Sequence, residues 1–512
     1  MTRPSLPMAF ACALALSPVL PASAATFTVT STADSGPGSL RAAIEAANAT
    51  SGNIHSVVIE LPPDSTIVLQ SELPAIEKPG FSISASGSPR LQITDQSQSS
   101  PFTDNAVPLL RVAPSNTLLT LVDLSLSSGE RVGGGGCLLA EPAAQNATLV
   151  LTRVNVVGCV GSRNTLFNSA YGAGVLVFNR SVNITGGAFE FNSFQNQPAG
   201  DFRVGGASLA VLADSAKQVV IEGTYFGESF ANGGNVSNGL AAAGGAIYIE
   251  GGARLSINRS RFSENRAFAL GANPSSGGAI HTDGNLLLEN TLFFEGGSAR
   301  GLVSATAADR TRTLNIRNTT FFRGDADGAG NSVIYSDYAD VLVRNTTFAG
   351  TTMGSASAGE IRVEARAGQT GPSLLRLSHT LFDAGTNPGA ACSVGPGVSV
   401  ERSFNLSSRP LPGCGITTTS TPLRLADFPD IPANGQGGFL ALGLDSPAVD
   451  AGNPVTPFVA DWTTCMSSDA RGVARPQNGS GNPLLSVCDI GAYEQEPMRI
   501  FRDGFEPVVP IR

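Results

Sequence analysis

Short segments in which apolar and polar residues alternate recur along the middle of the chain. The clearest of them begin with two glycines, at Gly244–Ile249 and Gly277–Thr282. Variants of this phrase begin at Gly134, Gly172 and Gly205, so that successive copies start 38, 33, 39 and 33 residues apart. Alternation with a period of two over about four to six residues is typical of β-strands and not of helices.

A second phrase follows the first and ends in phenylalanine. It consists of alternating aliphatic residues, a short polar stretch and then Phe, and it occurs at 255–262, 314–321, 341–348 and 375–382. After Phe189 and Phe262 the phrase continues to an asparagine, Asn192 or Asn265. Both phrases therefore belong to one repeat that holds two or three short strands.

Repeats of this length without helical periodicity predict an all-β solenoid in which each repeat forms one coil of a right-handed parallel β-helix. Equivalent strands would lie about 4.8 Å apart, and the inward Phe, Ile and Val side chains would form columns. Glycine suits the sharp corners, and asparagine tolerates the left-handed conformation there while bonding to the next coil. A β-sandwich is the alternative, but it does not explain why both phrases recur.

An open β-helix exposes apolar core and unpaired backbone at both ends, so capping elements are expected. Near the N-terminus, residues 27–30 have the pattern of a strand, and Ser39 is placed to cap a helix that extends to about Ala49. The apolar residues of this helix share one face that is suited to cover the first coil: Leu40, Ala43, Ile44 and Ala47.

The first residues have the pattern of a secretory signal peptide. Arg3 provides a positive charge, an apolar run covers residues 8–20, and residues 22–24 form a small-x-small cleavage sequence. The run is too short to cross a membrane, and no later segment reaches the ~18 apolar residues of a membrane helix. We expect cleavage near Ala24 and a mature protein that is secreted or held on the outer cell surface.

These patterns divide the chain into five segments. We expect a signal peptide at 1–24, an N-terminal cap and first coils at 25–104, β-helix repeats at 105–415, an irregular C-terminal cap at 416–496 and a tail at 497–512. A chain of 512 residues could form several ordinary domains, but a repeat fold grows as one unit.

Composition fits a folded β protein and excludes some partners. With 42% hydrophobic residues and 26 Phe, the chain is unlike a disordered Gly/Ser-rich segment, although it has 59 Gly. The formal net charge is −9 and the pI is about 5.0. The arginines are scattered and form no basic stripe, so we expect no nucleic-acid partner.

Six cysteines follow the expected cleavage site and fall into three local pairs. The separations within the pairs are 22, 22 and 23 residues, for Cys137 and Cys159, Cys392 and Cys414, and Cys465 and Cys488. An even number in an exported protein predicts disulfides. Proximity favours the three local pairings among the fifteen that six cysteines allow, and a zinc site is disfavoured because CxxC pairs are missing.

Several phrases resemble those of known exported bacterial proteins. The Gly-Gly-Ala-Ile sequences at 244–247 and 277–280 and the F-x-x-N sequences are similar to the repeats of polymorphic outer-membrane proteins. The sequence SLRAAIEAAN at 39–48 resembles the N-terminal module named for its CSLREA motif, but Gly38 and Ala42 depart from that motif. The resemblance implies a right-handed β-helix on a bacterial surface.

The C-terminal region resembles a third module, the choice-of-anchor Q domain of secreted bacterial β-helix proteins. Four phrases appear in the same order as in that domain, at 446–452, 469–472, 475–476 and 488–494. The resemblance implies a module at the end of the β-helix. Residues 500–506 resemble a short terminal signature of such proteins, and whether the chain is anchored stays open.

A set of charged residues in this region could be read in two ways. It comprises Asp450, Asp469, Arg471, Arg475, Asp489 and Glu494. Paired carboxylates could perform acid–base chemistry on a glycosidic bond. We instead expect ion pairs between arginine and carboxylate that lock an irregular cap.

No cofactor is expected, and calcium is the weaker alternative. Asp325 and Asp327, with Asn331, resemble the start of a calcium loop, but the remaining ligands of such a loop are missing. The three histidines, His55, His281 and His379, lie far apart in sequence. We therefore expect packing or surface roles for them and no catalytic residue.

The sequence thus predicts a non-enzymatic, adhesive or structural scaffold, monomeric, whose partner is an extracellular polysaccharide or a host or cell-surface ligand. The alternative is a lyase or hydrolase of the pectate-lyase-like β-helix class. Three carboxylates facing an arginine in a groove would favour the enzyme. Ladders of Thr, Asn and Ser on the flank would favour the scaffold.

Overall fold

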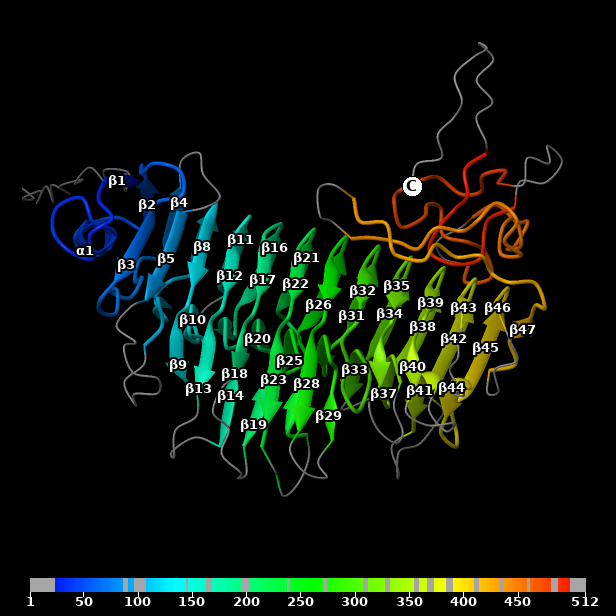
Figure 1. The fold of residues 1–512 in the computed structure, drawn as a ribbon. Coiled ribbons are helices and arrows are strands. Elements are labelled where there is room, and N and C mark those ends of the chain that lie inside the picture. Colours follow the sequence, from blue (N-terminus) through cyan, green and yellow to red (C-terminus); the bar gives the residue numbers. More distant parts are fainter. Residues whose placement is uncertain are drawn as a thin grey trace, which may run out of the picture.

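The chain winds into a parallel β-helix in this computed structural model (Figure 1). The structure describes residues 24–497 with the following gaps: 86–90, 96–106, 144–145, 163–167, 195–201, 235, 237–239, 270–273, 307–311, 327–331, 354–358, 366–372, 384–389, 409–413, 433–436, 458–460 and 480–486. The expected signal peptide and the last residues of the tail lie outside this range.

Three long sheets form the sides of the coils, and all their paired strands run parallel. Within the described ranges, sheet A has 13 strands, in the order β1 (Ala25–Val29), β2 (Ile54–Ile59), β4 (Gly80–Ala85), β7 (Leu118–Val122), β11 (Thr148–Thr152), β16 (Ser181–Thr185), β21 (Gln218–Glu222), β26 (Arg254–Asn258), β31 (Leu286–Glu289), β34 (Thr313–Arg317), β38 (Asp340–Arg344), β42 (Leu374–Ser378) and β45 (Ser399–Ser403). Sheet B, counted over the same ranges, also has 13: β3 (Thr66–Leu69), β5 (Leu91–Asp95), β8 (Leu124–Ser127), β12 (Asn155–Val157), β17 (Ala188–Glu190), β22 (Tyr225–Gly227), β27 (Arg261–Ser263), β32 (Leu292–Phe294), β35 (Thr320–Phe322), β39 (Thr347–Ala349), β43 (Leu381–Asp383), β46 (Leu406–Ser407) and β47 (Thr417–Thr418).

The third side is sheet C, which is shorter than sheets A and B, and smaller sheets form the corners. Sheet C contains, among the described residues, β6 (Leu110–Val112), β10 (Leu138–Ala140), β15 (Val175–Phe178), β20 (Leu209–Leu212), β25 (Ile247–Glu250), β30 (Ile280–Thr282), β33 (Val303–Thr306), β37 (Ile334–Asp337), β41 (Gly359–Glu364) and β44 (Ala390–Val394). Three small sheets widen the coils in the described part of the chain. The first contains β9 (Glu130–Val132), β13 (Val160–Ser162), β18 (Ser193–Phe194), β23 (Phe230–Gly233) and β28 (Arg266–Ala269), and the second contains β14 (Ser169–Tyr171), β19 (Arg203–Gly205), β24 (Ala242–Ala243) and β29 (Ser275–Ser276). The third consists of β36 (Asp325–Ala326) and β40 (Thr352–Met353).

The Phe of the second phrase forms the inward column of sheet B. Consecutive strands pair Phe262 with Phe293 and Phe293 with Phe321 in register. Ring centroids along the column are 4.8 to 5.0 Å apart, which matches the spacing of hydrogen-bonded strands. The column comprises Phe189, Phe226, Phe262, Phe293, Phe321, Phe348 and Phe382, all at most 1% exposed. The predicted stacking is therefore confirmed.

The corner between sheets A and B is left-handed in each coil from β7 onward, with the pair Gly186 and Gly187 after β16 and one residue in the other coils. Asparagine occupies it in three successive coils, as Asn290, Asn318 and Asn345, with φ between 44° and 50°. Asn290 donates to the Oδ1 of Asn258 in the preceding coil over 2.8 Å, as expected of a corner asparagine. From β21 to β42 the next residue is a buried Thr or Ser whose hydroxyl donates to the carbonyl two residues earlier, as at Thr319 over 2.8 Å.

The asparagines of the F-x-x-N sequences have a different position from the corner asparagines. The left-handed conformation falls on the preceding residue, Phe191 or Glu264. Asn192 is fully buried, donates to the carbonyl of Val156 and accepts from the N–H of Cys159, both over 2.9 Å. Its amide therefore pairs backbone groups of an adjacent coil that would otherwise be unsatisfied inside the helix.

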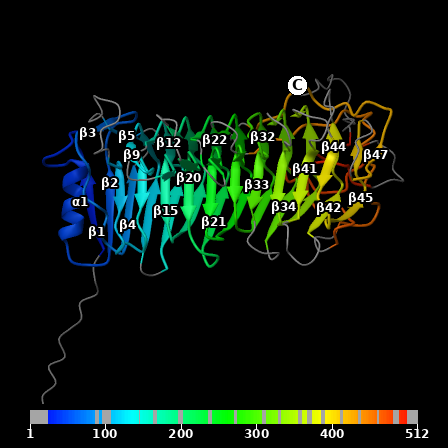
Figure 2. The same ribbon diagram turned by 90° about the horizontal axis from the view of Figure 1, so that it is seen from below.

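The N-terminal cap has the predicted form. Helix α1 (Leu40–Ala49) begins after Ser39, whose hydroxyl accepts from the N–H of Ala42 over 3.2 Å. Its buried face consists of Leu40, Ala43, Ile44 and Ala47. Figure 2 shows α1 lying across the N-terminal end of the coils.

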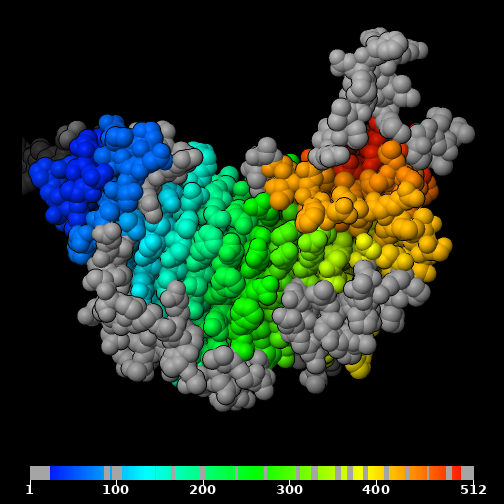
Figure 3. Space-filling model, viewed as in Figure 1, coloured from blue at the N-terminus to red at the C-terminus, as the bar shows by residue number. Residues whose placement is uncertain are grey.

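The C-terminal segment, residues 419–497, is irregular as predicted, but it lies along the flank of the coils. In Figure 3 the orange to red surface of this segment covers green and yellow coils. Where the C-terminal segment packs on sheet B, the outward positions of that sheet are apolar. Leu292, Leu381 and Leu406 occupy such positions and are at most 8% exposed. The last strands β44, β45 and β47 have no further strand beside them in the described part of the chain.

The structure contains three disulfides, and they join the local cysteine pairs. Cys137–Cys159 and Cys392–Cys414 lie within coils, with Cα–Cα distances of 5.8 and 5.5 Å. Cys465–Cys488 ties together two parts of the C-terminal segment, with a Cα–Cα distance of 6.5 Å. None of the helices among the described residues is long and apolar enough to cross a membrane.

Replacing Phe262 by alanine should remove one ring from the buried column and destabilise the protein by about 3–5 kcal/mol, since the neighbouring rings cannot close the gap. Phe268 is 42% exposed, so Phe268→Ala is the matched control and should have little effect. The midpoint of urea unfolding measures both changes. Equal shifts for the two variants would contradict the stacked core.

Candidate functional site

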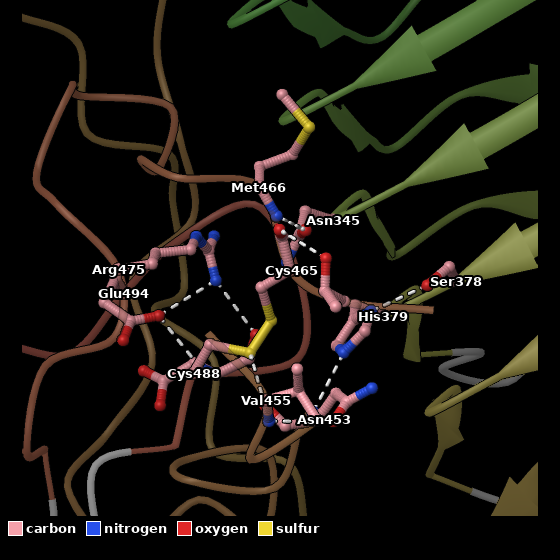
Figure 4. The surroundings of a disulfide bond; sticks show 12 residues. Asn345, Ser378, His379, Asn453, Val455, Cys465, Met466, Arg475, Cys488 and Glu494 are labelled. Atoms are coloured by element: carbon pink, nitrogen blue, oxygen red, sulfur yellow. Dashed lines mark hydrogen bonds and ion pairs between the residues drawn. A yellow bond between two sulfur atoms is a disulfide. The ribbon is translucent and has the colours of Figure 1, made fainter. Parts of the chain in front are cut away.

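The charged residues singled out in the sequence meet where the C-terminal segment packs on the corner between sheets A and B. Figure 4 shows this region around the disulfide Cys465–Cys488. The segment lacks regular secondary structure, so its backbone groups need other partners. Side-chain carboxylates, guanidinium groups and amides provide many of them.

An ion pair between Arg475 and Glu494 lies at the centre of this network. The Nη1–Oε2 distance is 2.9 Å, and both side chains are fully inaccessible to solvent. Arg475 also donates to the carbonyls of Asp489 and Gly491, each over 2.9 Å. Glu494 accepts from the N–H groups of Gln477 and Asp489 over 2.7 and 2.9 Å. Each charge thus binds both its opposite and the backbone.

Asp469 and Arg471 form the second part of the network. The carboxylate of Asp469 accepts from the N–H groups of Arg471, Val473 and Glu494 over 2.8 to 3.1 Å. Arg471 Nε donates to the same carboxylate over 2.8 Å, and its guanidinium lies 4.0 Å from the centroid of the Tyr493 ring. The short loop 469–473 is therefore held by one buried carboxylate.

Asp489 and Asp450 complete the set. Asp489 is fully buried and accepts from the N–H groups of Asp450 and Gln495 over 2.7 and 2.5 Å. Burial, and the nearby charge of Glu494, raise the pKa of Asp489. Burial likewise raises the pKa of Glu494, against the influence of Arg475. Asp450 contributes its backbone N–H to this network.

The six predicted residues are thus brought together, with four of them in the interior and Asp450 and Arg471 partly exposed. Asp469, Asp489 and Glu494 are at most 1% exposed, and Arg475 is 5% exposed. A glycosidic bond would have to reach two carboxylates across a groove. These three carboxylates face arginines inside the protein, so their arrangement fits a structural lock.

His379 connects the coils to the C-terminal segment. It is fully buried at the left-handed corner after β42, and its ring stacks on Phe404 at 5.1 Å. Nε2 accepts from the backbone N–H of Asn453 over 3.0 Å (Figure 4). Because that partner can only donate, Nε2 must be unprotonated, and Nδ1 carries the proton toward Ser378 Oγ, 2.7 Å away.

Neutral His379 is also favoured by its electrostatic surroundings. Burial lowers its pKa to about 3, and the charges of Arg475 and Arg344 act in the same direction. Its ligand atoms and the sulfurs of Cys465 and Cys488 lie within 4.8 Å of one another. The two sulfurs are bonded to each other, so they are not the thiolates that a zinc site requires.

The sequence offered no signal for two residues that anchor the segment. Arg344 is fully buried and donates to the carbonyls of Thr464 and Cys465 over 2.9 and 2.7 Å. Asn345 accepts from the N–H of Met466 over 2.8 Å. Both belong to the repeated phrase at 341–348, where they resemble the arginines and asparagines of other coils.

The other two histidines lie in different coils from His379. His281, on β30, is 3% exposed and its Nδ1 lies 2.8 Å from Ser304 Oγ. Burial lowers the pKa of His281 to about 4. His55, on β2, is fully buried with Nε2 3.3 Å from the carbonyl of Gly52. These contacts are those of packed residues.

No protein-family profile matches the sequence, and no curated protein is significantly similar to it. The resemblances to surface β-helix modules therefore rest on the short motifs alone. The fold and the contacts of the described residues carry the functional argument.

The calcium hypothesis stays a prediction. The backbone of Asp325 lies in β36, which pairs with β40. Asp327 and Asn331 lie outside the described residues.

Two clefts border the C-terminal segment. The larger has a volume of about 460 Å³ and lies between the coils and this segment, with Arg259, Asn290, Asp430, Phe439 and Arg471 in its lining. The smaller has a volume of about 280 Å³ and includes Trp462. Arg471 in the larger cleft is already bound to Asp469.

Replacing Arg475 by leucine should leave Glu494 charged and unpaired in the interior, at a cost of about 3–5 kcal/mol. The control is Arg424→Leu, because Arg424 and its partner Asp445 are 53% and 69% exposed. That change should cost less than about 1 kcal/mol. Urea unfolding and protease cleavage within residues 419–497 measure the difference, and equal effects would contradict the buried lock.

Acidification should weaken the C-terminal segment through His379. A histidine whose folded pKa is lowered contributes stability that is present above its ordinary pKa of 6.5 and is lost as the pH falls toward about 3. The loss is about 1.4 kcal/mol for each pH unit in this window. His379→Asn introduces the residue found at three earlier corners and removes the titrating group.

The difference in unfolding free energy between the wild type and this variant, measured from pH 7 to pH 4, isolates the contribution of His379. Wild-type stability should fall more steeply. Parallel pH profiles would contradict the neutral, hydrogen-bonded state of His379.

Proposed function

We propose that this protein is an exported, non-enzymatic β-helix scaffold that acts at a bacterial cell surface by binding an extracellular polysaccharide or another surface ligand. The observation that carries this proposal is the burial of the charged set. The residues best suited to acid–base chemistry, among them Asp489 and Glu494, are inaccessible and bind backbone groups.

The flank of the coils supports the same proposal. Thr291, Thr319 and Thr346 repeat one hydroxyl-to-carbonyl hydrogen bond in successive coils, at 2.7, 2.8 and 3.1 Å. Asn258, Asn290 and Asn318 add an amide ladder beside them. Such ladders stabilise a stack of coils.

Export is supported by the N-terminal sequence and by the disulfides. Disulfides persist in oxidising compartments and are rare in the cytosol. The resemblance of residues 446–494 to the choice-of-anchor Q module and of residues 39–48 to the CSLREA module suits a protein of the bacterial surface. These modules remain part of the proposal.

A panel of soluble polyuronides and neutral polysaccharides tests the absence of catalysis. We expect no new unsaturated ends and no new reducing ends after prolonged incubation, with a known β-helix lyase as positive control. We also expect the folded protein to sediment with at least one insoluble polysaccharide or with bacterial cells. Robust turnover of any polysaccharide would instead support the lyase or hydrolase alternative.

A further inference from the structure

The smaller cleft lies where the C-terminal segment meets β42 and β45, the last two strands of sheet A. Its lining includes Trp462, Arg376, Glu401, Asp461 and Thr463. The cleft has a volume of about 280 Å³, close to the lower end of the ~300–1,000 Å³ that small-molecule sites occupy. It therefore has room for about one sugar ring.

The indole of Trp462 lies among the guanidinium groups of Arg317, Arg344 and Arg376, at 5.7 to 5.8 Å from its centroid, and the backbone on both sides of it is fixed. Asp461 accepts from the N–H and the hydroxyl of Thr463, both over 2.8 Å, which closes a tight turn around the tryptophan. Two residues further on, Cys465 is fixed by its disulfide and by the hydrogen bond from buried Arg344. A half-buried aromatic ring that is fixed in this way can receive a ligand at little cost in side-chain entropy.

Polar groups of both kinds surround the ring. Arg376 donates to Glu401 over 2.6 Å, and its guanidinium lies 5.8 Å from the Trp462 centroid. Hydrogen bonds from Thr463 lower the pKa of Asp461, so this exposed carboxyl is ionised at neutral pH. The cleft thus combines an aromatic face, two carboxylates that accept hydrogen bonds and the guanidinium groups of Arg376 and Arg402, which donate them.

We propose that this cleft binds a neutral hexopyranose residue of an extracellular saccharide. The apolar face of the sugar would lie on Trp462, and its hydroxyls would donate to Glu401 and Asp461 and accept from Arg376. An acidic sugar fits less well, because the two carboxylates and two guanidinium groups of the lining already balance each other, and Arg376 is paired with Glu401. This inference rests on the proposed binding function and names the ligand class of one site.

Trp462 is the single tryptophan of the chain, so intrinsic fluorescence reports on this cleft. The probes are neutral methyl hexopyranosides and the matching hexuronates, titrated into the full protein. We expect a saturable change with at least one neutral glycoside and binding at least about tenfold weaker for its hexuronate, which corresponds to about 1.4 kcal/mol. Equal or tighter binding of the hexuronate, or no saturable change with any neutral glycoside, would overturn the proposal.

A matched pair of variants locates the binding. Glu401→Gln removes an exposed carboxylate and should weaken the neutral glycoside about tenfold. Glu364→Gln alters a similar surface pair with Arg362 and should leave binding unchanged. Equal weakening by both variants would count against the cleft. Trp462→Ala, followed by calorimetry, should abolish binding.

Sedimentation with insoluble polysaccharide separates this inference from the proposed function. If Trp462→Ala sediments as well as the wild type, the cleft is not the binding site, although the binding function stands. If the wild type sediments with no polysaccharide and no cells, the binding function itself fails, whatever the small glycosides do.

Discussion

The in-register stacking of one coil on the next is the constraint on which the whole molecule depends. Parallel strands hydrogen-bond along the axis, so each inward side chain must sit on its counterpart in the neighbouring coil. Phe262 lies between Phe226 and Phe293 at 4.9 and 4.8 Å for this reason. The corners must also recur at one place in every coil, which explains why a left-handed residue follows each strand of sheet A from β7 onward, with a buried hydroxyl after it from β21 to β42.

The C-terminal segment is under a different constraint, which is to find partners for its backbone polar groups. It has almost no regular secondary structure, so its N–H and C=O groups cannot pair with one another in a ladder. Buried Asp469, Asp489, Glu494 and Arg475 supply these partners, and their opposite charges offset part of the cost of burial. The coils add further anchors through the charged Arg344 and the neutral Asn345 and His379, whose polar atoms bind the backbone of the segment.

This division has a consequence for function. Charges that are used to hold an irregular segment are not available to a substrate, and the aromatic rings of the Phe column are used to fill the core. The ligand recognition that we propose must then rely on side chains outside both sets. Trp462 is such a residue, because buried Arg344 holds the nearby backbone at Cys465 while the Trp462 ring borders a cleft.

The sequence by itself determined the coil repeat, the inward Phe column, the Ser39-capped helix and the local cysteine pairs. Each of these features is encoded by a short segment of sequence, either as apolar residues that alternate with a period of two or as residues at a fixed spacing. Only the tertiary structure decided that the C-terminal segment lies along the flank and that Arg344, Asn345, His379 and Trp462 matter. Those contacts join residues up to 150 positions apart, as between Asn318 and Ser468, and they depend on the shapes of two surfaces, which no local pattern encodes.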